Sequence, residues 1–235
     1  RSMSDPAYRS LHDADCVFAI GSSLTLTSFG PSVPAGKSIV HATNDAGDIN
    51  KDYAVAQGLL GDAALTLDAL IAEVEDRLGD QVRADRSAAV RAAKQAWLET
   101  WMGQLTSDEV PINPYRVIWD MMGAVDRDNT IVTHDSGSPR EQFLPFWEAT
   151  TPGSYMGWGK STQLGHGLGL IMGAKLAAPN KLCINVMGDA AIGMVGMDIE
   201  TAARNKLGTI TVVFNNGVMA AERDSMPYAH EKFGA

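Results

Sequence analysis

The chain has 235 residues, of which 45% are hydrophobic, and a formal net charge of −9 at pH 7. This length and apolar content predict a globular protein of one or two domains, and the negative charge argues against binding to nucleic acid or to an anionic membrane. No apolar run approaches the roughly 20 residues that a membrane-spanning helix needs, and the polar residues after Arg1 are unlike a secretion signal.

Residues 1–78 have the pattern of a partial α/β domain. The runs 16–20 and 38–41 are short and apolar, as in buried strands. Residues 64–78 predict an amphipathic helix, with one apolar face made of Leu67, Leu70, Ile71 and Val74.

The two cysteines, Cys16 and Cys183, both fall in apolar runs that predict strands. Their distance in sequence and their apolar surroundings indicate reduced core residues and not a disulfide framework. We therefore expect a cytoplasmic protein.

Residues 79–112 are charged and rich in alanine, which is typical of a linker. Apolar side chains recur there at helical spacing, at Val90, Ala93, Trp97 and Trp101. This aromatic face could bind a partner, but a linker helix packed on its own domain is the favoured interpretation.

A second α/β domain is predicted over residues 113–235. Pro114 is placed where a helix can start, and the apolar face of that helix is made of Val117, Met121, Met122 and Val125. A strand over 130–133 then ends in the polar turn His134-Asp135-Ser136-Gly137-Ser138. A serine hydrolase is a weak alternative for this turn, because the Gly-x-Ser-x-Gly elbow is absent.

The glycine-rich segment 163–169 predicts the start of a helix that runs to about Ala177. A dinucleotide-binding fingerprint is one alternative. It is disfavoured because that motif should directly follow a strand, whereas residues 158–161 do not read as one.

The most informative segment is a strand, turn, helix and strand over residues 182–216. Gly188-Asp189-Ala190-Ala191 follows the first strand and Asn215-Asn216 follows the second. One helix is expected between them, ending near Gly208, with Ile192, Val195, Ile199 and Ala202 on its apolar face. A right-handed crossover would make the strands parallel, so that Asp189 and Asn216 converge at one edge of the sheet.

Carboxylate and amide oxygens suit a hard cation such as Mg²⁺, and the amides of residues 190–192 suit an anion. No Lys or Arg occurs between Gly188 and Glu200 to neutralise that anion. A diphosphate held through a divalent cation fits this pattern.

The Gly188-Asp189-Ala190 segment followed by Asn215-Asn216 resembles the signature of thiamine diphosphate (ThDP) enzymes of the acetolactate synthase and 2-oxo-acid decarboxylase superfamily. The resemblance implies Asp189, the side chain of Asn216 and the backbone carbonyl of Val218 as Mg²⁺ ligands. Leu164 would prop ThDP in its bent form. The cofactor-binding residues that it implies are Gly137, Ser138, Gln163, Leu164, Gly188, Asp189, Ala190, Ala191, Asn216, Val218, Met219 and Ala220.

Residues 14–23, 44–51 and 61–63 resemble the central domain of the same superfamily, which normally has about twice this length. Ser23 and Thr27 stand where the FAD-binding acetolactate synthases have arginines. FAD binding is therefore not expected.

The resemblance implies two three-layer α/β units with parallel sheets, and a ThDP- and Mg²⁺-dependent decarboxylation or carboligation of a 2-oxo acid, like that of acetolactate synthase. A non-oxidative 2-oxo-acid decarboxylase, an oxalyl-CoA-type decarboxylase or a cofactor-binding fragment without activity are the alternatives.

No catalytic residue is assigned, because the family's catalytic Glu belongs to a pyrimidine-binding domain with no counterpart in the 235 residues. That domain would come from the same or another chain of a homodimer or homotetramer. We expect a fragment or half of a split enzyme, inactive alone.

Overall fold

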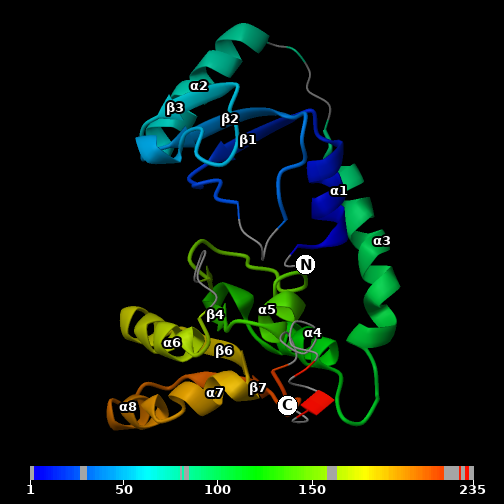
Figure 1. Cartoon of the computed structure of the whole chain (residues 1–235), viewed down its shortest axis with the longest axis vertical. Helices are drawn as coiled ribbons and strands as arrows, with labels where there is room; N and C mark the ends of the chain where they lie inside the picture. Colours follow the sequence, from blue (N-terminus) through cyan, green and yellow to red (C-terminus); the bar gives the residue numbers. More distant parts are fainter. Residues whose placement is uncertain are drawn as a thin grey trace. The chain divides into compact units, whose positions relative to one another are not determined.

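The computed structural model describes residues 3–26, 31–79, 81, 85–157, 163–219, 228 and 231–232. The chain forms two compact units, Met3–Thr100 and Trp101–Ala235, and the division falls within the long helix α3 (Ser87–Leu105). Each unit contains a parallel sheet with helices beside it, which confirms the predicted fold class (Figure 1). The predicted domain limits, 1–78, 79–112 and 113–235, stay predictions.

The first unit is a three-stranded parallel sheet. Its strands β1 (Cys16–Ile20), β2 (Ser38–Thr43) and β3 (Gln57–Leu60) lie in the order β1-β2-β3. The other elements are α1 (Asp5–Asp13), the 3-10 turn η1 (Ala46–Asp48) and α2 (Ala63–Leu78). The predicted strands and helix are thus confirmed, with β2 two residues longer than expected.

The burial predicted for this unit is partly wrong. On the apolar face of α2, Leu67 is 40% exposed and Ile71 is 55% exposed. A sheet of three short strands offers too little surface to cover a helix of 16 residues. Cys16 is also exposed, because it begins an edge strand, whereas Cys183 is buried as expected.

The second unit is a four-stranded parallel sheet in the order β5-β4-β6-β7. Its strands are β4 (Thr130–His134), β5 (Tyr155–Met156), β6 (Leu182–Gly188) and β7 (Ile210–Phe214). Its helices are α4 (Pro114–Ala124), α5 (Ser138–Phe143), α6 (His166–Ala177), α7 (Asp189–Val195) and α8 (Asp198–Arg204), with the 3-10 turn η2 (Arg127–Asn129) before β4.

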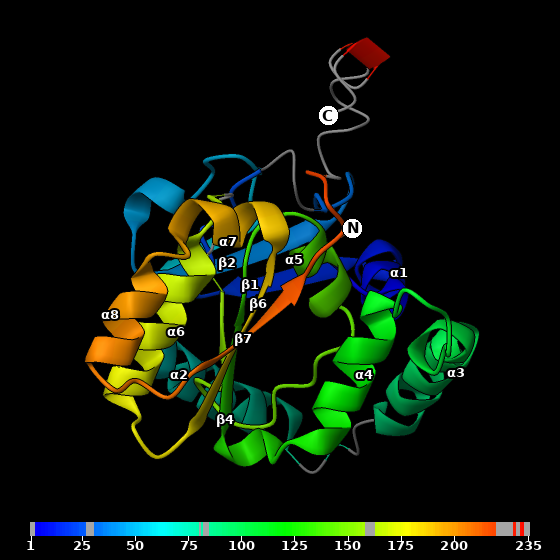
Figure 2. The same cartoon turned by 90° about the horizontal axis from the view of Figure 1, so that it is seen from below.

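Helices cover both faces of this second sheet (Figure 2). On one face α6 packs on β4 and β6 with α8 beside it, and on the other α5 packs on the same strands with α4 beside it. Ile131 and Cys183 meet Ile171 and Ala174 of α6 in one buried cluster. Because β4 and β6 are covered on both faces, they read in the sequence as continuous apolar runs.

The single helix predicted after Gly188 is wrong, because the chain forms two short helices, α7 and α8. The break is at Gly196, whose backbone N–H donates to the carbonyl of Ile192 at 2.7 Å. A Cβ at Gly196 would lie 2.7 Å from that same oxygen, so the tight turn needs glycine. Ile199 is consequently exposed, while Ala202 stays buried as predicted.

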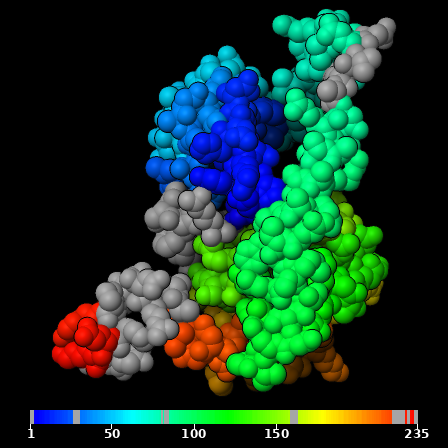
Figure 3. All heavy atoms as spheres, turned by 90° about the vertical axis from the view of Figure 1, so that its right-hand side faces the viewer, coloured from blue at the N-terminus to red at the C-terminus, as the bar shows by residue number. Residues whose placement is uncertain are grey.

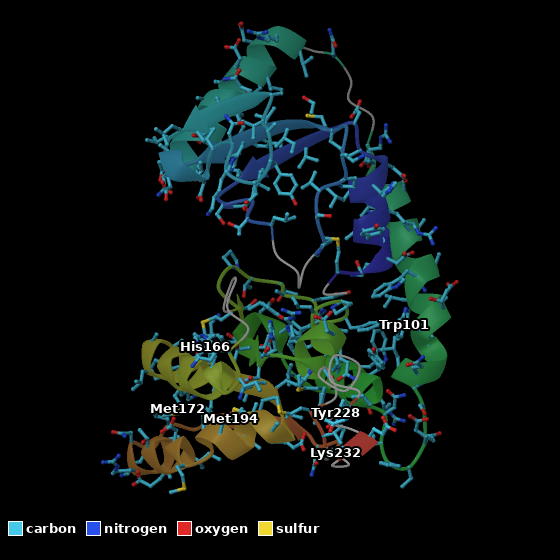
Figure 4. The ribbon with its side chains drawn as sticks, in the orientation of Figure 1. Trp101, His166, Met172, Met194, Tyr228 and Lys232 are labelled. Carbon is cyan, nitrogen blue, oxygen red and sulfur yellow. The ribbon has the colours of Figure 1, made fainter. Side chains whose placement is uncertain are left out.

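The C-terminal end of α3 belongs to the core of the second unit. Trp101 (Figure 4) lies with its ring centroid 5.0 Å from Tyr115 of α4 and 5.1 Å from Phe146. These contacts support the interpretation of a helix packed on its own domain at this end of α3, whereas Val90 on the same predicted face is 66% exposed. Most of the remaining length of α3 is exposed at the surface (Figure 3).

The helix α4 begins at Pro114 as predicted, with the Asn113 side chain accepting from the N–H of Tyr115. Its fully buried residue is Ile118, which the prediction missed. The predicted core residues Val117, Met121 and Met122 of α4, and Val125 directly after it, are half-buried. Within the described part of the chain, no helix is both long enough and apolar enough to cross a membrane.

Candidate functional site

Three neighbouring strands of the second sheet end at the same edge. In the parallel register His134 pairs with Val186, and Gly188 pairs with Phe214. The polar segments that begin at Asp135, Asp189 and Asn215 therefore follow adjacent strand ends, which is where ligands bind in open α/β sheets. This confirms the predicted parallel pairing of the two strands that precede Asp189 and Asn216.

Asp189 is the first residue of α7 and is half-buried. No hydrogen bond or ion pair of its carboxylate is present within the described part of the chain. Gly188 lies close to the β4 side of this edge, since a Cβ there would be 3.8 Å from the Pro139 ring. Ala190 is half-buried and Ala191 is buried.

Asn215 and Asn216 form two successive turns after β7. The Asn215 side-chain oxygen accepts from the N–H of Gly217, and the Asn216 oxygen accepts from the N–H of Val218, both at 3.1 Å. An amide oxygen has two lone pairs, so Asn216 can still bind a cation. Asn216, Val218 and Met219 are exposed, and Ala220 lies outside the described residues.

A buried acid, Asp135, connects the segments of the site, although it is not among the site residues predicted from the sequence. Its Oδ1 accepts from the N–H groups of Ser136 at 2.8 Å and Gly165 at 3.0 Å. Its Oδ2 accepts from the N–H of Gly167 at 2.9 Å, and the residue is 0% exposed. One feature of the sequence points to such an acid. The helix α6 begins after a glycine and has no Ser, Thr, Asp or Asn cap of its own, so its first N–H groups need an acceptor from another segment.

The turn that carries Gln163 and Leu164 is held by Gly165. This glycine has a φ of +88°, and a Cβ there would lie 2.4 Å from Cγ1 of Val195, the last residue of α7. Leu164 is half-buried and Gln163 is exposed. The turn thus meets both Asp135 and the helix that begins with Asp189.

The turn that carries Gly137 and Ser138 is the start of α5. Gly137 precedes the helix with a φ of +80°, which favours glycine, and both residues are half-buried. Asp135 accepts from the backbone of both turns, those at 135–138 and 163–167. The structure therefore gathers the predicted residues of four segments, 137–138, 163–164, 188–191 and 216–219, at one sheet edge. His166, at the first position of α6, is exposed (Figure 4).

His134 is buried on the α5 side of β4. Its Nδ1–H donates to the backbone carbonyl of Asp135 at 3.0 Å, and its ring centroid lies 5.7 Å from that of Tyr155. Burial lowers the pKa of His134, and the positive charge of Arg140 lowers it further, against the opposing effect of Asp135. Burial likewise raises the pKa of the Tyr155 phenol. Burial therefore favours the neutral form of His134.

This burial predicts a pH dependence of stability. The pKa of His134 is lower in the folded than in the unfolded chain, so the unfolded chain binds more protons just below about pH 6.5. The free energy of unfolding should therefore fall on acidification, and it should fall less in His134→Gln. Urea unfolding at pH 7 and pH 5 measures this difference. His12→Gln, at an exposed position of α1, should behave as the unmodified chain does. If the free energy of unfolding fell by the same amount between pH 7 and pH 5 in the unmodified chain and in His134→Gln, the assignment of this pH dependence to His134 would be contradicted.

Comparison with known proteins agrees with this geometry. Residues 135–235 match the family description "Thiamine pyrophosphate enzyme, C-terminal TPP binding domain". Residues 1–70 match "Thiamine pyrophosphate enzyme, central domain". The C-terminal match begins at the buried Asp135, directly after β4, and includes the ends of β6 and β7.

Several curated relatives are similar over most of the chain. A probable acetolactate synthase of Mycobacterium bovis is 29% identical over 73% of this chain and 30% of its own length. A 2-hydroxyacyl-CoA lyase of Arabidopsis thaliana is 29% identical over 91% of this chain and 39% of its own. A sulfoacetaldehyde acetyltransferase of Castellaniella defragrans is 28% identical over 94% of this chain and 40% of its own. The chain thus spans well under half the length of these relatives.

Proposed function

Because the chain belongs to the thiamine pyrophosphate enzyme family, we propose that the edge formed by β4, β6 and β7 holds the diphosphate of ThDP together with Mg²⁺. The reaction proposed is decarboxylation of a 2-oxo acid followed by carboligation, as the acetolactate synthase relatives suggest. The observation that carries this proposal is the half-buried Asp189 at the end of β6, beside the strand that leads to Asn216.

The donor atoms at this edge fit a hard cation. Asp189 offers a carboxylate, Asn216 a side-chain amide oxygen and Val218 a backbone carbonyl, and Mg²⁺ prefers oxygen ligands of these kinds. Within the residues that the structure describes, no three His, Cys, Asp or Glu side chains gather as a metal site. A cation here would therefore depend on one carboxylate and on the phosphate oxygens of the cofactor.

The remaining predicted residues are assigned to the cofactor. Gly137 and Ser138 would donate to the diphosphate from the start of α5, beside Gly188, Ala190 and Ala191. Gln163 and Leu164 would contact the rest of the cofactor, and Leu164 would provide its apolar support. Met219 and Ala220 would contact the cofactor directly after the metal ligands in the sequence. When bound, ThDP supplies an electron sink for the pair released on loss of carbon dioxide.

Asp189→Ala tests the metal assignment. Mg²⁺ and the diphosphate each neutralise the other, so their binding should be reciprocally coupled, and losing the carboxylate should weaken both. We expect ThDP affinity in the presence of Mg²⁺ to fall about tenfold or more, as for loss of a charged partner. Titration calorimetry measures both affinities.

The matched control for this experiment is Asp198→Ala, which removes an exposed carboxylate from the first turn of α8. It should leave both affinities unchanged. Wild-type affinity for ThDP in Asp189→Ala, with Mg²⁺ present, would refute the metal assignment.

We further propose that the first unit does not use FAD. The segment 22–26, at the carboxyl edge of its sheet, is held by hydrogen bonds to other polar groups of the same unit. The N–H of Leu26 donates to Asp52 at 2.9 Å, and Lys51 donates to the Thr25 hydroxyl at 3.3 Å. The Ser23 hydroxyl, which lies 3.2 Å from that of Thr25, is uncharged and cannot replace the arginine that FAD-binding acetolactate synthases have at this position. Thr27, the other departure, lies outside the described residues.

The proposed partner is a pyrimidine-binding domain of the same or another chain, in a homodimer or homotetramer. Apolar surface on α6 and α7 supports a protein contact there, since Leu176 is 67% exposed and Met194 is 59% exposed. Figure 4 places Met194 on α7 and Met172 on α6. The proposed location is the cytoplasm, where the two free cysteines would stay reduced.

A 2-hydroxyacyl-CoA lyase reaction is the second candidate. It is suggested by the plant lyase, which is as identical to this chain, at 29%, as the mycobacterial synthase is. A decarboxylase of the oxalyl-CoA type would belong to the same chemistry. Testing pyruvate against a 2-hydroxyacyl-CoA thioester as substrates separates the two candidates.

A further inference from the structure

One buried carboxylate ties together two segments that are about thirty residues apart. Asp135 accepts three backbone hydrogen bonds, one from the turn after β4 and two from the start of α6. A buried charge is costly unless it is fully bonded, and here all three donors are within 3.0 Å. The carboxylate also lies at the positive end of α6, which has no side-chain cap from its own segment.

The packing around this carboxylate leaves little room for it to shift. A Cβ added to Gly167 would lie 3.2 Å from Asp135 Oδ2 and 2.4 Å from the Asn185 side-chain oxygen. Asn185 is itself 0% exposed and lies on β6, three residues before Gly188. The start of α6 thus packs closely on β4 and β6 at the point where its N–H groups donate to the Asp135 carboxylate.

We propose that Asp135 is a positioning residue for the bound cofactor. It fixes the turn that carries Leu164 relative to the turn that carries Gly137 and Ser138. The apolar side chain proposed to support the cofactor is thereby held at a fixed position relative to the residues proposed to bind the diphosphate. It touches neither substrate nor cofactor. This role rests on the proposed function, and it adds a residue whose effect is transmitted through backbone N–H groups.

Asp135→Asn in the full-length protein expressed from its gene tests the proposal. The amide oxygen can still accept from Ser136 and Gly165, but the amide nitrogen then faces the N–H of Gly167, donor against donor. We expect ThDP affinity to fall about tenfold, which matches one lost charge-assisted bond. The near-ultraviolet circular dichroism of bound ThDP should change, and at saturating ThDP kcat should fall with KM nearly constant.

Asp126→Asn is the matched control at the other end of β4. Asp126 also accepts from a backbone N–H, that of Asp128 at 3.1 Å, and its replacement should lower stability without changing ThDP affinity or dichroism. An Asp135→Asn protein with wild-type affinity and dichroism would overturn the proposal while leaving the proposed function intact. A wild-type protein that does not bind ThDP would overturn both.

Hydrogen exchange in the unmodified protein provides a test that does not require the variant to fold. If Asp135 couples the two turns around the cofactor, adding ThDP should slow exchange at the amides of Gly165 and Gly167. The amides of α8 serve as the reference, because α8 contributes none of the proposed cofactor contacts. Exchange at the two glycines that ThDP leaves unchanged would overturn the proposal.

Discussion

Gly165→Ala, in the turn that leads into α6, should strongly destabilise the second unit. Two costs combine at this position. An alanine must adopt a φ of +88°, and its Cβ would lie 2.4 Å from Val195 Cγ1. Left-handed backbone costs about 1–2 kcal/mol and overpacking about 1–3 kcal/mol, so the free energy of unfolding should fall by about 2–5 kcal/mol. ThDP affinity should fall with it, because Leu164 is the preceding residue.

Urea unfolding measures this loss, and Gly169→Ala is the matched control. Gly169 lies within α6, which begins directly after Gly165, and a Cβ there meets nothing within 4 Å. That variant should be more stable by about 0.5–1 kcal/mol, because alanine is favoured over glycine inside helices. Adding Val195→Ala to Gly165→Ala should remove the destabilisation that comes from the clash with the Val195 side chain. It should not remove the destabilisation that comes from the left-handed backbone at residue 165. Equal stability of Gly165→Ala and the unmodified chain would contradict the geometry.

The 235-residue chain alone should not turn over a 2-oxo acid. The chemistry requires a carboxylate within hydrogen-bond reach of the aminopyrimidine ring, which the family draws from its pyrimidine-binding domain. Each acidic side chain described near the site already has a hydrogen-bond partner, an ion-pair partner or a proposed role. Asp135 accepts three N–H groups, Asp189 is assigned to the cation, and Glu141 is paired with Arg140. Glu200 lies on the separate helix α8 and pairs with Arg204 at 3.1 Å.

The measurement is carbon dioxide release by the purified chain incubated with ThDP, Mg²⁺ and pyruvate. The expected rate equals that of a protein-free control, even if the chain binds ThDP. The same chain with Asp189→Ala shows whether any residual signal depends on the proposed site. Release above the protein-free rate that disappears in this variant would mean that the 235 residues hold a complete catalytic site.

The sequence by itself determined the strands β1, β2, β4, β6 and β7, the parallel pairing of β6 with β7 and the chemical groups that follow these two strands. The apolar runs that became β1, β4, β6 and β7 are local patterns, and short apolar runs joined by helical segments favour parallel pairing. Asp189 and Asn216 could be predicted to share an edge because each follows such a strand directly. The glycines of the 163–169 segment could be predicted to open a helix for the same local reason.

Only the tertiary structure decided features that depend on contacts between distant segments. Nothing near Asp135 in the sequence indicates that its acceptors face Gly165 and Gly167, thirty or more residues away. The need for glycine at 165 comes from Val195 on another helix. The exposure of the α2 face likewise depends on how much sheet is available to cover it, since periodicity indicates which side of a helix is apolar but not whether another element packs there.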